Sequence, residues 1–283
     1  MTQPEFRVLG PVEVRRDSRT LPIGDKALAV SAGLLVSANE LVSVDTITEW
    51  VWGGRLPAHP RAALHNVLSR LRGLYGPDVI ETRRGGYRLV TDADHLDLLR
   101  FRELTAAAHD AVGRDSDPDA ADLLGRALAL WRPPPLANVN SAVLSRDAAG
   151  RLTEQYMNAQ ETHAQVCLRL RRHPVVIEHL SEQVAAHPYR ESLAGLLMLA
   201  QVRGGRRADA LTTYETVRGA LRDGLGIDPG TPLQQLYLRI LRGHRTPDSE
   251  SRNGTAARNF RDDRDGIPRR RPNSDGDPRE LSA

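Results

Sequence analysis

The sequence contains few of the residues that build disulfide, thiolate-metal or membrane-spanning structures. Its 283 residues include one cysteine, Cys167, which excludes an internal disulfide framework and a metal site made of several thiolates. No apolar run approaches the roughly 18 residues that a spanning helix needs. The N-terminus also lacks a basic region followed by an apolar stretch. We therefore expect a soluble, cytoplasmic protein without a membrane partner.

The common signatures of enzyme active sites and cofactor sites are missing as well. The nine histidines never form the HExxH pattern of zinc enzymes, and the nucleophile pattern GxSxG does not occur. Asp115 begins an acidic run that imitates a calcium loop, but Ala120 and Arg126 stand where that loop requires Gly and Glu. We predict no catalytic residue, no metal site and no cofactor.

The length is about twice that of a typical domain and therefore favours two domains. The first domain is expected to combine α and β elements. Its strands are expected near 6–8, 12–14 and 21–23, its helices at 26–38, 45–52 and 60–75, and a hairpin at 79–90. This order of elements is that of a winged helix-turn-helix domain, which we place at residues 1–95.

Local signals support these elements. Asp45 is expected to cap the second helix at its N-terminus. From Leu64 to Leu71, apolar residues of the third helix recur at the i, i+3, i+4, i+7 spacing of a buried stripe. Gly85 and Gly86 are expected to supply positive φ angles for the hairpin turn.

Residues 96–244 show helical patterns in pairs, and no strand pattern returns. Within them, segment 197–214 carries small and aromatic residues in an order that resembles a tetratricopeptide repeat. We therefore expect an all-α, tetratricopeptide-like domain. Residues 245–283 are polar and nearly devoid of large apolar side chains, so we expect a disordered tail. The three tryptophans, Trp50, Trp52 and Trp131, are predicted to be packing residues.

Positive charge is concentrated around the third helix and the hairpin. The chain has a formal net charge of +3, yet segment 55–90 contains seven arginines and two acids, a local charge of +5. Such a concentration is typical of an anion-binding face, most simply one for nucleic acid. A solvated basic face is the alternative interpretation.

The candidate DNA-binding residues lie on the polar side of the third helix and on the hairpin. Arginine can bond guanine through two hydrogen bonds and asparagine can pair with adenine, whereas arginine on phosphate adds affinity without sequence information. The helix alone is compatible with an ordinary solvated face, and the adjoining basic hairpin shifts the balance towards DNA. The candidates are Lys26, Arg61, His65, Asn66, Ser69, Arg70, Arg72, Thr82, Arg83 and Arg84.

Several longer segments together resemble the actinobacterial antibiotic regulatory proteins, which join an OmpR-type winged helix to a bacterial transcriptional activation domain. They are FRVLGPVEV, LVSVDTITEWVWGG, LSRLRGLYGP, TRRGGYRL, ALALWRPPPLA and LLMLAQVRGGRRADALTTYETVRGALRDGLGIDPGTPLQQLYLRIL. The resemblance covers nearly residues 5–243, and the presence of a single lysine, Lys26, suits a GC-rich genome.

The resemblance implies a transcriptional activator of a secondary-metabolite gene cluster. Such a protein binds short direct repeats near a promoter, self-associates on these tandem sites and contacts RNA polymerase, and this chain looks like a small, stand-alone member. By the same analogy, Arg70 falls at a base-contacting position and Arg72 at a phosphate-contacting one. Thr82 and Arg83 fall where the wing meets the DNA backbone.

Two other classes of protein stay open on the sequence alone. One is a helical-repeat adaptor whose basic N-terminal module binds an acidic protein or RNA. The other is a regulator gated by a small ligand, which requires an apolar pocket with a few convergent polar groups in the helical domain.

Overall fold

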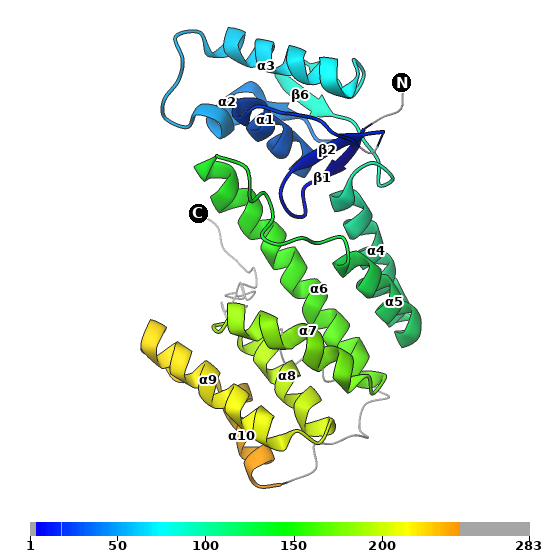
Figure 1. Ribbon diagram of the computed structural model, residues 1–283, viewed down its shortest axis with the longest axis vertical. Helices are drawn as coiled ribbons and strands as arrows, with labels where there is room; N and C mark the ends of the chain where they lie inside the picture. Colours follow the sequence, from blue (N-terminus) through cyan, green and yellow to red (C-terminus); the bar gives the residue numbers. More distant parts are fainter. Residues whose placement is uncertain (1–3, 18, 244–283) are drawn as a thin grey trace, which may run out of the picture.

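The computed structural model describes residues 4–17 and 19–243, in which an α+β part precedes an all-α part (Figure 1). The α+β part contains β1 (Glu5–Arg7), β2 (Glu13–Arg16), β3 (Arg19–Thr20), α1 (Asp25–Val36), β4 (Val42–Ser43), α2 (Val44–Trp52), α3 (Pro60–Tyr75), β5 (Ile80–Arg83) and β6 (Gly86–Leu89). Its strands form two antiparallel three-stranded sheets, in the orders β1-β2-β3 and β4-β6-β5.

The all-α part follows without a further strand in the described range. It contains α4 (Asp97–Gly113), α5 (Asp117–Leu128), the π-helical turn η1 (Leu144–Ala149), α6 (Gly150–Arg169), α7 (His173–Ala186), α8 (Glu191–Arg203), α9 (Arg207–Leu225) and α10 (Thr231–Leu241). From α4 to α9, each helix packs on the next, and α10 packs on α8 and α9. None of the helices in the described residues is long and apolar enough to cross a membrane. The predicted tail at 245–283 lies outside the described residues.

Two local predictions were wrong in detail. Ser43, not Asp45, caps α2, because its side chain accepts a hydrogen bond from the Thr46 amide at 3.0 Å, while Asp45 lies in the first turn. Of the two hairpin glycines, only Gly85 has a positive φ, at 92°. Gly86 is required for a different reason, since a Cβ there would collide with the Val42 carbonyl group of β4.

The buried stripe of α3 anchors it in the α+β part. Leu64, Leu68 and Leu71 are all at most 1% exposed, as their helical spacing predicted. Tyr75 ends the helix in the core, where its hydroxyl lies 2.6 Å from Ser31 Oγ of α1. Burial raises the pKa of the Tyr75 hydroxyl above its ordinary value. One face of α3 is therefore fixed and its other face is turned outward.

The loop between β1 and β2 is completed by residues of the all-α part. The amides of Val8 and Leu9 donate to the Asp97 carboxylate at 2.9 and 3.2 Å. The Val12 amide donates to Asn138 Oδ1 at 2.7 Å, and Asn138 Nδ2 donates back to the Val12 carbonyl at 3.0 Å. Buried backbone groups are costly to leave unpaired, so the two parts of the chain complete each other.

The segment that follows α5 runs along the same loop. The Arg132 amide donates to the Leu9 carbonyl and the Leu136 amide to the Gly10 carbonyl, both at 2.7 Å. A Cβ on Gly10 would lie 2.6 Å from the Arg132 carbonyl oxygen, so this close approach requires glycine.

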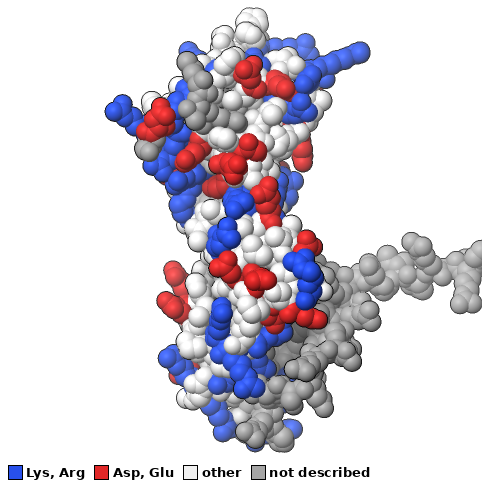
Figure 2. All heavy atoms as spheres, turned by 90° about the vertical axis from the view of Figure 1, so that its right-hand side faces the viewer, with Lys and Arg blue, Asp and Glu red and all other residues white. Residues whose placement is uncertain are grey.

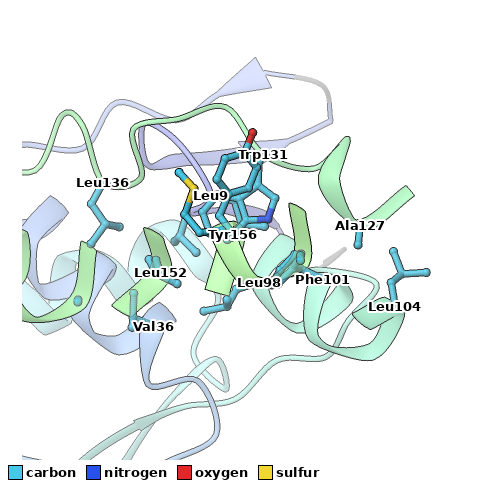
Figure 3. Packing of buried hydrophobic residues seen from close by; sticks show 14 of the residues in the cluster. Leu9, Val36, Leu98, Phe101, Leu104, Ala127, Trp131, Leu136, Leu152 and Tyr156 are labelled. Carbon is cyan, nitrogen blue, oxygen red and sulfur yellow. The ribbon is translucent and has the colours of Figure 1, made fainter. Parts of the chain in front are cut away.

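A shared hydrophobic core lies between the two parts (Figure 3). Trp131 is 7% exposed, and its ring meets Phe101 edge-on with the centroids 5.1 Å apart. Its centroid is 4.9 Å from that of Tyr156 on α6. Leu9 and Val36 of the α+β part belong to the same cluster of buried side chains. Trp131 is thus confirmed as a packing residue.

Trp50 and Trp52 are also confirmed as packing residues. Both are partly buried and lie against the core. The Trp50 ring occupies the space beside Gly33 of α1, where any larger residue would collide with it.

Asp97 should make stability depend on pH. Burial raises the pKa of its carboxyl from 3.8 to about 6, outweighing the amides of Val8 and Leu9 and the Arg132 guanidinium, which lower it. The folded state then binds more protons than the unfolded state, so this stabilising contribution is complete below about pH 4 and is lost as pH rises through 6. The loss is on the order of 2–3 kcal/mol.

Urea unfolding of the native chain and of Asp97→Asn at several pH values tests this expectation. The native chain should lose stability relative to the variant between pH 4 and pH 6 and then run parallel to it. A difference that stays constant over this range would contradict the assignment.

Candidate nucleic-acid interface

Helix α3 lies at one end of the molecule, far from α9 and α10 at the other end (Figure 1). Arginine and lysine side chains project at this end, with acidic side chains between them (Figure 2). The hairpin β5–β6 follows α3 directly in the chain and pairs through β6 with β4. The elements predicted to bind DNA are therefore neighbours in the fold.

The outward face of α3 carries six of the candidate residues, of which Arg72 is only partly exposed. The other five are exposed: Arg61, His65, Asn66, Ser69 and Arg70. They share the polar side of the helix, opposite the buried leucine stripe. Within the described residues, neither Arg61 nor Arg70 has a hydrogen bond or an ion pair, so both guanidinium groups are available to a ligand.

Arg72 is only partly exposed, because its guanidinium group turns towards the hairpin. Its Nε donates to the Ile80 carbonyl at 2.9 Å, and its Nη2 donates to Thr82 Oγ1 at 2.7 Å. Its Cζ lies 5.9 Å from the centroid of the Tyr87 ring. The structure thus brings Arg72 and Thr82 together, as partners of each other.

Three arginines of the hairpin differ in their partners. Arg83 and Arg88 both donate to Glu81 Oε2, with Nη2 distances of 2.9 and 2.6 Å. The hydrogen bond from Arg88, and to a smaller extent that from Arg83, holds the pKa of the Glu81 carboxyl below its ordinary value. Arg84, at the turn, is exposed and has neither a hydrogen bond nor an ion pair within the described chain. Arg84 is therefore the available cation at the hairpin tip.

Lys26 lies on a different element from the other candidates. It is exposed in the first turn of α1, where its ammonium group is 5.8 Å from the centroid of the Trp52 ring. This distance is within the range of a cation–π contact. Its proposed contact with DNA depends on how far a duplex extends beyond α3 and the hairpin.

Sequence reasoning did not single out Glu81, Tyr87 or Arg88 as parts of this site. Glu81 and Arg88 face each other across the hairpin, and Thr82 faces Tyr87. Once the turn at Arg84 and Gly85 is fixed, counting outward from it gives these pairs, so the signal was present in the hairpin register.

Comparison with known proteins finds a matching family model and several similar regulatory proteins. The family model described as the bacterial transcriptional activator domain matches residues 96–241. The chain is 38% identical over 238 residues to the regulatory protein AfsR of Streptomyces coelicolor, which covers 83% of this chain and 24% of AfsR. It therefore spans about a quarter of the length of AfsR. It is 32% identical over 246 residues to the transcriptional regulatory protein MoaR1 of Mycobacterium tuberculosis, covering 84% of this chain and 79% of MoaR1.

A solved structure has a similar fold. EmbR of Mycobacterium tuberculosis, determined in complex with a low-affinity phosphopeptide, superposes with a TM-score of 0.80 at 32% identity. The match covers 88% of this chain and 67% of that one. The helix-rich arrangement described above is therefore shared with a known regulator.

These matches define the class as bacterial transcriptional regulators, and not enzymes. Within that class, the chain belongs to the family of actinobacterial antibiotic regulatory proteins.

The close approach of the hairpin to β4 gives a stability prediction. Gly86→Ala should lower the free energy of unfolding by about 1–3 kcal/mol, because the added methyl group collides with the Val42 carbonyl group. Gly73→Ala is the matched control, since Gly73 is exposed on α3 and a Cβ added there would have no atom within 4 Å. This variant should gain roughly 0.5–1 kcal/mol. Urea unfolding measures both, and equal stabilities for the two variants would contradict the close packing of the hairpin.

Proposed function

We propose that this chain is a sequence-specific DNA-binding transcriptional activator. In this proposal residues 1–95 form an OmpR-type winged helix-turn-helix domain and residues 96–244 form a tetratricopeptide-like activation domain. The observation that carries it is the row of exposed polar side chains on α3 beside a basic hairpin tip. Membership of a family of transcriptional regulators supports it independently.

The dimensions of α3 suit a major groove. Sixteen residues give a helix roughly 24 Å long. The major groove of B-form DNA is about 12 Å wide and admits such a helix. Arg70 can bond guanine O6 and N7, and Asn66 can bond adenine N6 and N7. We assign base contacts to these two residues and supporting contacts to His65 and Ser69.

The remaining candidates other than Arg72 are assigned to the DNA backbone. Arg61 in the first turn of α3 is placed for a phosphate. Arg83 and Arg84 on the hairpin are suited to a phosphate or to a neighbouring narrow minor groove. The Thr82 hydroxyl is a further polar group at the same edge, and Lys26 is assigned to phosphate outside the central contact.

The proposed partners are those that membership of the family implies. Direct repeats require winged helices in the same orientation, so we propose that two copies bind head to tail on tandem half-sites about one helical turn or a multiple apart. The repeats would lie near promoters of a secondary-metabolite, or antibiotic, gene cluster, in the cytoplasm at the nucleoid. The all-α part would then contact the RNA polymerase holoenzyme.

Arg70→Ala is the direct test of base recognition. It should cost roughly 1–3 kcal/mol on the recognised site and relax the sequence preference, because a two-bonded base contact is lost. Genome-wide footprinting of the native chain should recover promoter-proximal direct repeats. Titrations of those sites at several salt concentrations then compare the two proteins.

The matched control is Arg100→Ala, which removes a partly exposed arginine of α4 whose one ion pair within the described residues is with Glu103. It should bind the recovered sites like the native chain. Equal losses on specific and random duplexes for Arg70→Ala would refute the base contact. Salt-sensitive binding without any shared sequence would refute specific recognition altogether.

A further inference from the structure

We propose that Arg72 is a positioning residue of this interface, which locks the hairpin β5–β6 to the C-terminal end of α3. The inference rests on the proposed function and deepens it. It assigns Arg72 to the geometry of the hairpin, where the family resemblance alone implies a phosphate contact.

The contacts of Arg72 join two elements that a DNA-binding face must hold in register. From the last turns of α3, its Nε reaches the Ile80 carbonyl at 2.9 Å and its Nη2 reaches Thr82 Oγ1 at 2.7 Å. The planar guanidinium group presents these donors in a rigid fork. Both acceptors lie on β5, so one side chain fixes that strand at two points against the helix.

The position of β5 at the edge of its sheet leaves room for this contact. In the order β4-β6-β5, strand β5 is at the edge, so its outer side has no neighbouring strand. The inner strand β6 is held by β4, where Val42 pairs with Tyr87 and Ser43 with Gly86. Because Ser43 also caps α2, the hairpin is tied to α2 on one side and, through Arg72, to α3 on the other.

Comparison with Arg70 shows that the contacts with the hairpin are specific to position 72. Arg70, two residues earlier on the same helix, is exposed and has no partner in the described part of the chain. Arg72 is partly buried, and its Cζ is 5.9 Å from the centroid of the Tyr87 ring, which covers it from the hairpin side. Of its three nitrogens, two donate inside the protein.

The consequence concerns the hairpin tip. Arg84 extends from the turn that β5 leads into, so its distance from Arg70 depends on the contact between β5 and α3. Loss of the two Arg72 hydrogen bonds would remove neither Arg70 nor Arg84 but would change the distance between them. Specific DNA, which must meet both at once, should then be affected more than random DNA.

Arg72→Lys separates positioning from phosphate binding. Lysine keeps the positive charge and can still neutralise a phosphate, but it lacks the Nε–Nη2 fork. If Arg72 positions the hairpin, binding to the recognised site should weaken about tenfold, as in Arg72→Ala, since roughly one hydrogen bond of stabilisation is lost. The dependence of random-duplex binding on salt should stay that of the native chain. Binding of Arg72→Lys within about twofold of the native protein would overturn the proposal.

Amide hydrogen exchange of the free protein provides a second readout that does not depend on DNA. Arg72→Lys and Thr82→Val should each speed exchange in 80–89 about tenfold, with α1 unchanged, whereas Arg61→Lys should leave the hairpin at the native rate. Thr82→Val preserves every charge and decides the outcome if Arg72→Lys folds poorly. If the amide exchange rates of the hairpin are unchanged in both test variants, the proposal that Arg72 positions the hairpin is overturned. Failure of the native chain to bind any specific sequence would overturn only the proposed function.

Discussion

The pairing of the β1–β2 loop with residues of the all-α part is the constraint on which the rest of the structure depends. The amides of Val8, Leu9 and Val12 have their partners in Asp97 and Asn138, up to 126 positions away in the chain. Since a buried amide must be bonded, the loop forms fully only when the helical part is in place. The shared core around Trp131 then joins the two parts by packing as well as by hydrogen bonds.

This constraint fixes where the candidate interface can point. The core beneath α3 includes Phe6 of β1, whose ring meets Tyr75 edge-on with the centroids 5.1 Å apart. The sheet whose β1–β2 loop is paired with the all-α part therefore also supports α3. In the same last turn of α3, Arg72 links the helix to the hairpin through its bonds to Ile80 and Thr82. The polar face of α3 and the all-α part are thus held in one fixed relation.

Much of the fold could be predicted from the sequence, because helices and hairpins are specified by local spacing. The Leu64–Leu71 stripe and the turn at Gly85 are examples, and the exposed face of α3 follows from the same stripe. What could not be predicted depends on contacts between distant residues. Serine and aspartate are both residue types that cap helices, and only the pairing of β4 with β6 selects Ser43 over Asp45. The bond from Arg72 to Thr82 likewise requires the hairpin to be folded back on α3.

Amide hydrogen exchange at Val8, Leu9 and Val12 in the full chain tests the shared framework most directly. If the two parts form one cooperative unit, these three amides should exchange only with global unfolding, at the rate of the buried amides of α3 and α6. Exchange far faster than in those helices, with α3 and α6 still protected, would show that the loop opens by itself. The two parts would then be independently folded domains, contrary to this account.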